Sequence, residues 1–122
     1  MRIDAMKHRP VVPLLAALVA VSMIGGLLRL GETSLAVGLI PSPWDKLAHA
    51  LTFGTIALSL WLAVRQRWLG ACVGIAFAIA AYDEWRQLYL PGREADLLDL
   101  LANAVGIALA ALLAIRLRTD SR

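Results

Sequence analysis

Residues 97–115 of the chain read LLDLLANAVGIALAALLAI, a run of 19 residues of which all but Asp99, Asn103 and Gly106 are apolar. An apolar run of about 18 residues or more predicts a helix that spans a membrane. Similar runs cover residues 11–28 and 47–64, and a shorter one covers residues 68–82. The shorter run reaches spanning length only if its helix continues through Asp83, Glu84 and Gln87 to Leu90, which places polar groups at membrane depth.

The composition agrees with a membrane protein and excludes several other classes. The chain has 122 residues, of which 60% are hydrophobic and 17% charged, and its mean hydropathy is +0.71. Soluble domains are about 45–50% apolar and about 25% charged. A soluble domain, a disordered chain and a disulfide-linked scaffold are therefore disfavoured. The single cysteine, Cys72, lies inside an apolar run and is expected to be buried.

We therefore predict an all-α integral membrane protein: one domain, residues 1–122, that forms a bundle of four transmembrane helices with short loops. The predicted spans are about 11–30, 45–64, 68–90 and 96–116. Pro91-Gly92 ends the third helix, and the short connection Arg65-Gln66-Arg67 makes the second and third helices antiparallel neighbours. A cleaved signal peptide is the alternative interpretation of the first span.

The basic residues predict the orientation in the membrane. Eight of the twelve lysines and arginines fall on the side that holds both chain termini, whereas seven of the nine acidic residues fall on the other side. Because cytoplasmic loops are rich in Lys and Arg, both termini are expected in the cytoplasm of a bacterium, with the chain in its inner membrane. The net charge of +3 then reflects orientation, and no nucleic-acid partner is predicted.

Ionisable side chains gather at the predicted outer ends of three helices. Asp45 and His49 are spaced to share one helix face, and Glu84 pairs with Gln87, or else Asp83 does. Asp96, Asp99 and Asn103 form a single stripe on the last span, and Gly106 and Ala110 continue it with small residues. Such small residues let helices approach closely, and Gly70, Gly74 and Ala78 predict the same for the third helix. We expect the polar faces to converge in a pocket open to the outside.

Three segments resemble the VanZ-like family, named for a teicoplanin-resistance protein of glycopeptide-resistance clusters. They are DKLAHALTF at residues 45–53, DEWRQ at residues 83–87 and PGREADLLDLLANAVG at residues 91–106. The resemblance implies a small multi-span bacterial membrane protein. It implies no biochemical activity, because most members have none assigned, and only a few members carry the antibiotic phenotype.

The residues leave several functions open. Oxygen ligands from Asp45, Glu84, Asp96, Asp99 and Asn103, with His49 as the lone nitrogen donor, would suit Mg²⁺ or Ca²⁺ better than zinc. Alternatively, Lys46 and Arg93 would hold the phosphate of a lipid-linked cell-envelope precursor. A hydrolase or transferase would use His49 as a base oriented by Asp45, with Glu84 as the acid. Proton or ion translocation is a further alternative.

The bland interpretation is a structural network in a subunit of a membrane complex, in which Lys46, Arg86 and Arg93 only neutralise the carboxylates. Our prediction is a non-enzymatic envelope protein in the lipid bilayer that binds a divalent cation or a lipid-linked ligand. An oligomer is possible. A link to glycopeptide resistance follows from the resemblance alone. The predicted ligand-binding residues are Asp45, Lys46, His49, Glu84, Gln87, Arg93, Asp96, Asp99 and Asn103. Trp44, Trp61, Trp68, Tyr82, Trp85 and Tyr89 are expected to form interfacial belts.

Overall fold

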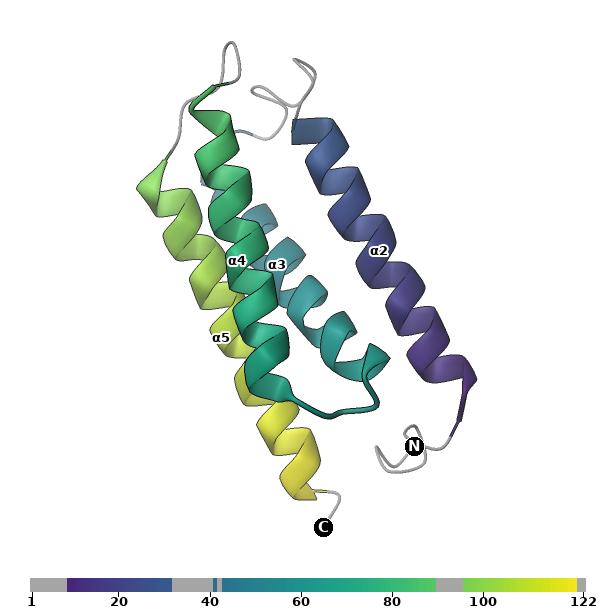
Figure 1. Cartoon of the computed structure of the whole chain (residues 1–122). Coiled ribbons are helices and arrows are strands. Elements are labelled where there is room, and N and C mark those ends of the chain that lie inside the picture. Colours follow the sequence, from purple (N-terminus) through teal and green to yellow (C-terminus); the bar gives the residue numbers. More distant parts are fainter. Residues whose placement is uncertain (1–8, 32–40, 42, 90–95, 121–122) are drawn as a thin grey trace.

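The computed structural model describes residues 9–31, 41, 43–89 and 96–120, and within them all regular secondary structure is α-helical. The four helices are α2 (Val11–Gly31), α3 (Trp44–Ala63), α4 (Leu69–Gln87) and α5 (Leu97–Asp120) (Figure 1). The predicted all-helical bundle of four helices is thereby confirmed.

Three of these helices are long and apolar enough to cross a membrane: α2 over Val11–Arg29, α3 over Trp44–Ala63 and α5 over Leu97–Thr119. Helix α4 differs because Asp83, Glu84 and Arg86 lie in its last two turns. It begins at Leu69, after Trp68 in a left-handed conformation, and ends at Gln87. The predicted continuation to residue 90 lies partly outside the described residues, and Leu88 and Tyr89 form a turn.

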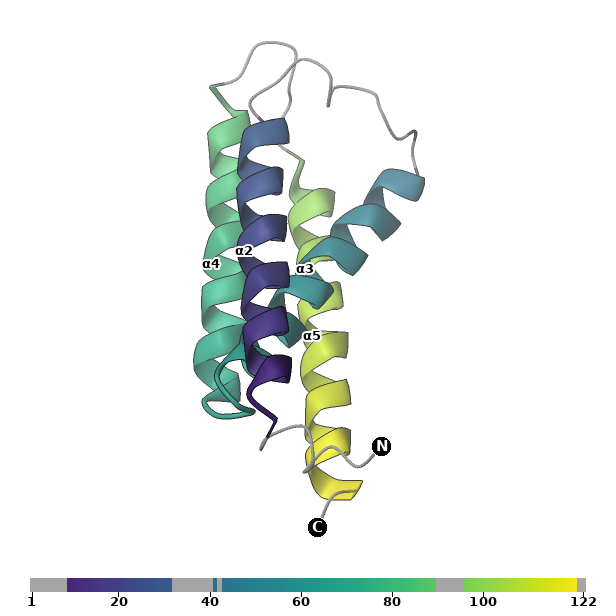
Figure 2. The same ribbon diagram turned by 90° about the vertical axis from the view of Figure 1, so that its right-hand side faces the viewer.

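Consecutive helices run in opposite directions, so α3 and α5 are parallel to each other (Figure 1). Their amino-terminal ends lie at the same end of the bundle as the carboxyl-terminal ends of α2 and α4. We call this the acidic end, because it carries Asp45, Asp83, Glu84, Asp96 and Asp99. Helix α3 is inclined to the other three (Figure 2) and packs most extensively against α5.

The connection between α3 and α4 is a tight turn of five residues, 64–68. Arg65, Gln66 and Trp68 have positive φ values of 58°, 64° and 51°, which are uncommon for residues with a side chain. The backbone N–H of Gln66 donates to the carbonyl of Trp61 at 2.8 Å and closes the turn. This short turn makes α3 and α4 antiparallel, as the sequence predicts.

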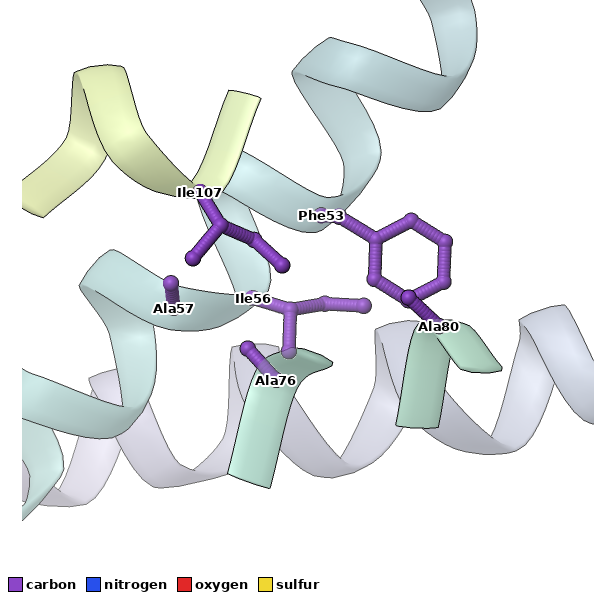
Figure 3. Packing of buried hydrophobic residues seen from close by; sticks show 6 residues of the cluster. All are labelled: Phe53, Ile56, Ala57, Ala76, Ala80 and Ile107. Atoms are coloured by element: carbon purple, nitrogen blue, oxygen red, sulfur yellow. The ribbon is translucent and has the colours of Figure 1, made fainter. Parts of the chain in front are cut away.

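The core lies where α3, α4 and α5 meet, and Figure 3 shows its central cluster. Its members are Phe53, Ile56, Ala57, Ala76, Ala80 and Ile107. A second cluster holds Trp61, Cys72 and Ala114. Cys72 is buried as predicted, whereas Trp61 is fully buried and not part of an interfacial belt. The belt prediction for Trp61 is wrong because this side chain packs against Cys72 of α4 and Ala114 of α5.

The outer faces of the helices expose large apolar side chains. Examples are Leu14 and Leu18 of α2, and Leu97, Leu109 and Leu112 of α5. A water-soluble protein of this size rarely exposes so much contiguous apolar surface. These faces are suited to contact with the hydrocarbon of a bilayer, which agrees with the spanning helices.

Small residues bring α3 and α5 into close contact, as predicted for Gly106. A Cβ atom built on Gly106 would overlap the carbonyl group of Ala50, and one on Gly54 would lie 2.9 Å from the carbonyl oxygen of Gly106. The corresponding prediction for α4 is wrong. A Cβ on Gly70 or Gly74 would meet nothing within 4 Å, and Ala78 is also exposed, because this face of α4 points away from the other helices.

Replacing Gly106 by alanine should therefore destabilise the protein. The added methyl group must push α3 and α5 apart, and overpacking of this kind costs about 1–3 kcal/mol. The free energy of unfolding in detergent measures the effect. Gly74→Ala is the matched control, since its methyl group meets open space and alanine favours the helix by up to about 1 kcal/mol. Equal effects of the two changes would contradict the proposed contact.

Candidate functional site

The Lys46 ammonium group lies among three carboxylates at the acidic end. Its Nζ atom is 3.1 Å from Oδ2 of Asp45 and 2.8 Å from Oδ2 of Asp96, and it also donates to Oδ1 of Asp99. Lys46 and Asp45 belong to α3, whereas Asp99 lies in the first turn of α5. The ammonium group thus joins the amino-terminal ends of two helices. Negative side chains are also favourable there, because they offset the helix dipoles.

Asp96 connects three helices through different atoms. Its Oδ1 atom accepts the backbone N–H of Leu98 at 2.9 Å, so Asp96 is the N-cap of α5 rather than its first helical residue. Its Oδ2 atom accepts from Lys46 of α3. Its backbone N–H donates to Oε1 of Glu84 on α4. One residue therefore fixes the mutual positions of all three helices at this end.

His49 contacts α5 one turn below Lys46. Its Nδ1 atom donates to Oδ1 of Asn103 at 3.0 Å, and its Nε2 atom lies 3.6 Å from Oδ2 of Asp99. Asp45 pairs with Lys46, so it does not orient His49 as the sequence suggested. The physical reason is that the stripe of α5 packs against the His49 face of α3 and supplies both partners of the imidazole.

Asp83, Arg86 and Gln87 form a separate group on α4. Arg86 Nη2 and Gln87 Nε2 each lie 3.4 Å from a carboxylate oxygen of Asp83. Gln87 therefore pairs with Asp83, which the sequence offered as the alternative to Glu84. Asp83 and Arg86 were not predicted as site residues. Their spacing of three positions is the signal that would have found this ion pair.

The structure brings together seven of the nine predicted binding residues. They are Asp45, Lys46, His49, Glu84, Asp96, Asp99 and Asn103, and we call them the polar cluster. Gln87 is buried nearby on α4 and bonds outside the cluster. Arg93 lies outside the described residues.

Some buried atoms of the polar cluster lack hydrogen-bond partners. Within the described part of the chain these atoms are Oδ1 of Asp45, Oε2 of Glu84 and Nδ2 of Asn103. Glu84 is 6% exposed and Asn103 is 0% exposed. Leaving a buried polar atom unpaired costs about 1–3 kcal/mol. Such atoms are therefore candidates for contact with a ligand.

The described side chains do not form a ready-made metal site. Among them, no group of three or more His, Cys, Asp and Glu side chains is placed to hold a metal ion. The position between Asp45, Asp96 and Asp99 is already occupied by the Lys46 ammonium group. Mg²⁺ would need about six oxygen ligands there and Ca²⁺ six to eight.

Aromatic side chains surround the acidic end of α4. Tyr82, Trp85 and Tyr89 are exposed, and the ring centroid of Trp85 lies 6.0 Å from that of Tyr82 and 5.3 Å from that of Tyr89. Trp44, at the start of α3, is exposed as well. Exposed Trp and Tyr mark the boundary between hydrocarbon and head groups in membrane proteins. Their positions fit a polar cluster close to a membrane surface.

Comparison with known proteins yields one family. The family model described as VanZ/LLP1 matches residues 6–118 of the chain. No curated protein gave a significant match, and no solved structure did.

The Lys46 contacts lead to a prediction about stability. Lys46→Met leaves three carboxylates close together without their ammonium partner. We expect a loss of roughly 2–3 kcal/mol, less than the roughly 3–5 kcal/mol typical of a fully buried pair, because the Lys46 side chain is 27% exposed. Unfolding in detergent measures the loss, with the exposed Arg29→Gln as the control. A second change, Asp99→Asn, should restore part of it, and a cost no larger than the control would contradict the prediction.

Asp96 adds a prediction about pH. Its pKa is lowered from the ordinary value of 3.8, first because Lys46 donates to the carboxylate and next because the Leu98 N–H does. A lowered pKa stabilises the folded state above the pKa of the unfolded chain, and this stability is lost as pH falls through the folded value. Asp96→Asn keeps the helix cap but removes the charge. The difference in Tm between wild type and Asp96→Asn should therefore be largest near neutral pH and vanish in acid; a constant difference would contradict this.

Proposed function

The chain belongs to the VanZ/LLP1 family, and on this premise we propose that it is a membrane protein that binds a cell-envelope ligand at its polar cluster. The ligand is a lipid-linked head group in preference to a free metal ion. The protein acts by binding, and its helices provide the frame that holds the cluster at one end of the bundle.

The observation that carries this proposal is the set of unpartnered buried atoms in a cluster built from three helices. A purely structural network is expected to satisfy its buried polar atoms. Here the described contacts leave Oδ1 of Asp45, Oε2 of Glu84 and Nδ2 of Asn103 without partners. A bound ligand with both donors and acceptors would be able to pair with atoms of both kinds. This supports ligand binding over the structural network.

The preference for a head group over an ion rests on Lys46. Its ammonium group already occupies the position between Asp45, Asp96 and Asp99 in which their carboxylates would otherwise hold a divalent cation. A head group needs hydrogen-bonding side chains near a membrane surface, and the exposed Trp44, Trp85 and Tyr89 support such a location.

The side of the membrane is also part of the proposal. The end of the bundle opposite the polar cluster holds the exposed Arg9, Arg65, Arg67, Arg116 and Arg118. The excess of basic residues supports a cytoplasmic location for that end, with both termini inside the cell. The polar cluster would then face the outer leaflet of a bacterial inner membrane. A role in teicoplanin resistance rests on the family resemblance alone.

The geometry gives less support to a hydrolase or transferase that uses His49 and Glu84 as an acid–base pair. His49 bonds to Asn103 and approaches Asp99, whereas Glu84 bonds to the backbone of Asp96. In these contacts the imidazole and the Glu84 carboxylate do not meet. His49→Asn separates the two functions, because it abolishes acid–base chemistry and leaves the other head-group contacts in place.

Thermal unfolding of the purified protein in detergent tests the proposal. The protein is melted with a chelator, then with Mg²⁺, Ca²⁺, Mn²⁺, Zn²⁺, a polyprenyl phosphate and membrane phospholipids in turn. A ligand at 100 times its Kd stabilises by roughly 2.7 kcal/mol, so a specific head group should raise Tm clearly. Asp99→Asn should reduce the rise, whereas Asp120→Asn, at the other end of α5, should not.

Two results would overturn the proposal. If no probe raises the Tm of the wild-type protein, the polar cluster is a structural network. If a divalent cation raises Tm and the phospholipids and polyprenyl phosphate do not, the cluster is an ion site.

A further inference from the structure

Resting on the proposed function, we propose that the ligand of the polar cluster carries a primary ammonium group, which Glu84 binds through its Oε2 atom. The inference concerns the chemical class of the ligand. It follows from three features of the cluster: a carboxylate oxygen without a partner, more carboxylates than cationic groups, and two carboxylates that are partly exposed.

Glu84 supplies the unused acceptor. Its Oε1 atom accepts the backbone N–H of Asp96, which directs the carboxylate toward the polar cluster. Its Oε2 atom is buried and has no partner among the described residues. An oxygen of an ionised carboxylate can only accept hydrogen bonds, so a partner of the ionised Glu84 side chain is a donor. The Oδ1 atom of Asp45 is a second acceptor in the same condition.

The charges of the cluster favour a cationic donor over a neutral one. Among the described residues the cluster holds four carboxylates, against which stand the Lys46 ammonium group and, when it is protonated, the His49 imidazole beside Asp99. The Asp83 carboxylate is paired separately with Arg86. Uncompensated charge near the hydrocarbon of a membrane is costly. A positively charged ligand is therefore expected to bind with a more favourable free energy than a neutral hydroxyl.

The number of oxygen ligands that a cation needs favours an ammonium group over a metal ion at this position. A divalent ion needs six or more oxygen ligands, whereas an ammonium group needs only one to three acceptors. Lys46 demonstrates the arrangement within this cluster, because its ammonium group is held by three carboxylates. A quaternary ammonium has no N–H to donate, so the site should discriminate between primary and quaternary amines.

Two members of the polar cluster, Asp96 and Asp45, are partly exposed. Their side chains are 41% and 28% exposed, whereas Glu84 and Asn103 are buried. An amine that approaches from the membrane surface would therefore meet the carboxylates of Asp96 and Asp45 before that of Glu84. The fully buried Asn103 offers a donor, Nδ2, for an oxygen of the same head group.

Lipids that differ only in their head groups test the inference. Full-length protein in detergent is melted with phosphatidylethanolamine, phosphatidylcholine or phosphatidylglycerol of identical acyl chains. We expect phosphatidylethanolamine to raise Tm by roughly 5–10 °C at saturation and the other two to have little effect. Free ethanolamine is a further arm: a comparable rise shows that the amine suffices, and a smaller one shows that the lipid chains contribute.

The variant Glu84→Gln keeps the shape of the side chain but removes the charge. It should abolish the difference between the ethanolamine and choline lipids, whereas Asp120→Asn, an equal change of charge at the far end of α5, should preserve it. If Glu84→Gln does not fold, a methylation series replaces it. Mono-, di- and trimethylated ethanolamine lipids should then stabilise the wild-type protein progressively less.

The outcomes separate this inference from the proposed function. Equal stabilisation by the ethanolamine and choline lipids, or a preference that survives in Glu84→Gln, overturns the ammonium assignment. Stabilisation by phosphatidylglycerol or polyprenyl phosphate alone also overturns it, while the proposed head-group site stands. If none of these probes changes Tm, both the inference and the proposed function fail.

Discussion

The close contact between α3 and α5 at Gly106 is the constraint on which the other interactions depend. Because Gly106 has no side chain, the backbone of α5 reaches the carbonyl of Ala50. Asn103 lies one turn of α5 before Gly106 and meets His49, and Asp99 lies a further turn before it and meets Lys46. The two helices run in the same direction, so the three contacts follow in the same order along both helices (Figure 1). The apolar packing and the polar cluster are thus parts of one interface between α3 and α5.

This arrangement explains how so short a chain can carry several charges at the end of a helical bundle. The Lys46 ammonium group offsets part of the negative charge, and Asp96 uses its backbone as well as both carboxylate oxygens. One oxygen atom of Glu84 and one of Asp45 still have no hydrogen-bond partner among the described residues. Binding of a cation would therefore stabilise the bundle and satisfy the site at the same time. Under the proposed function, stability and ligand recognition would rely on the same few atoms.

Helical periodicity was sufficient to predict much of the fold and of the polar cluster, and the predictions that failed share one cause. It placed Asp96, Asp99, Asn103 and Gly106 on one stripe, and the structure shows that this stripe faces α3. It did not predict that Asp45 pairs with Lys46, that Trp61 is buried, or that the small residues of α4 are exposed. In a membrane protein the outward faces are as apolar as the inward ones, so the sequence indicates which residues share a face but not which neighbour that face meets. Long-range contacts such as that between Glu84 and the Asp96 backbone depend on how each helix is rotated about its axis.

The Lys46 bridges also constrain how the protein is made. Its partners Asp96 and Asp99 follow it by 50 and 53 positions in the chain. At a synthesis rate of about 5–20 residues per second, α3 emerges from the ribosome roughly 3–10 s before they do. During this interval Asp45 is the one of the three carboxylates around Lys46 that has been synthesised, and the interface between α3 and α5 has not yet formed. The bridges between α3 and α5 can therefore form only after residues 96–99 have been synthesised, and a chain that ends before residue 96 would leave Lys46 with Asp45 as the one carboxylate of the three.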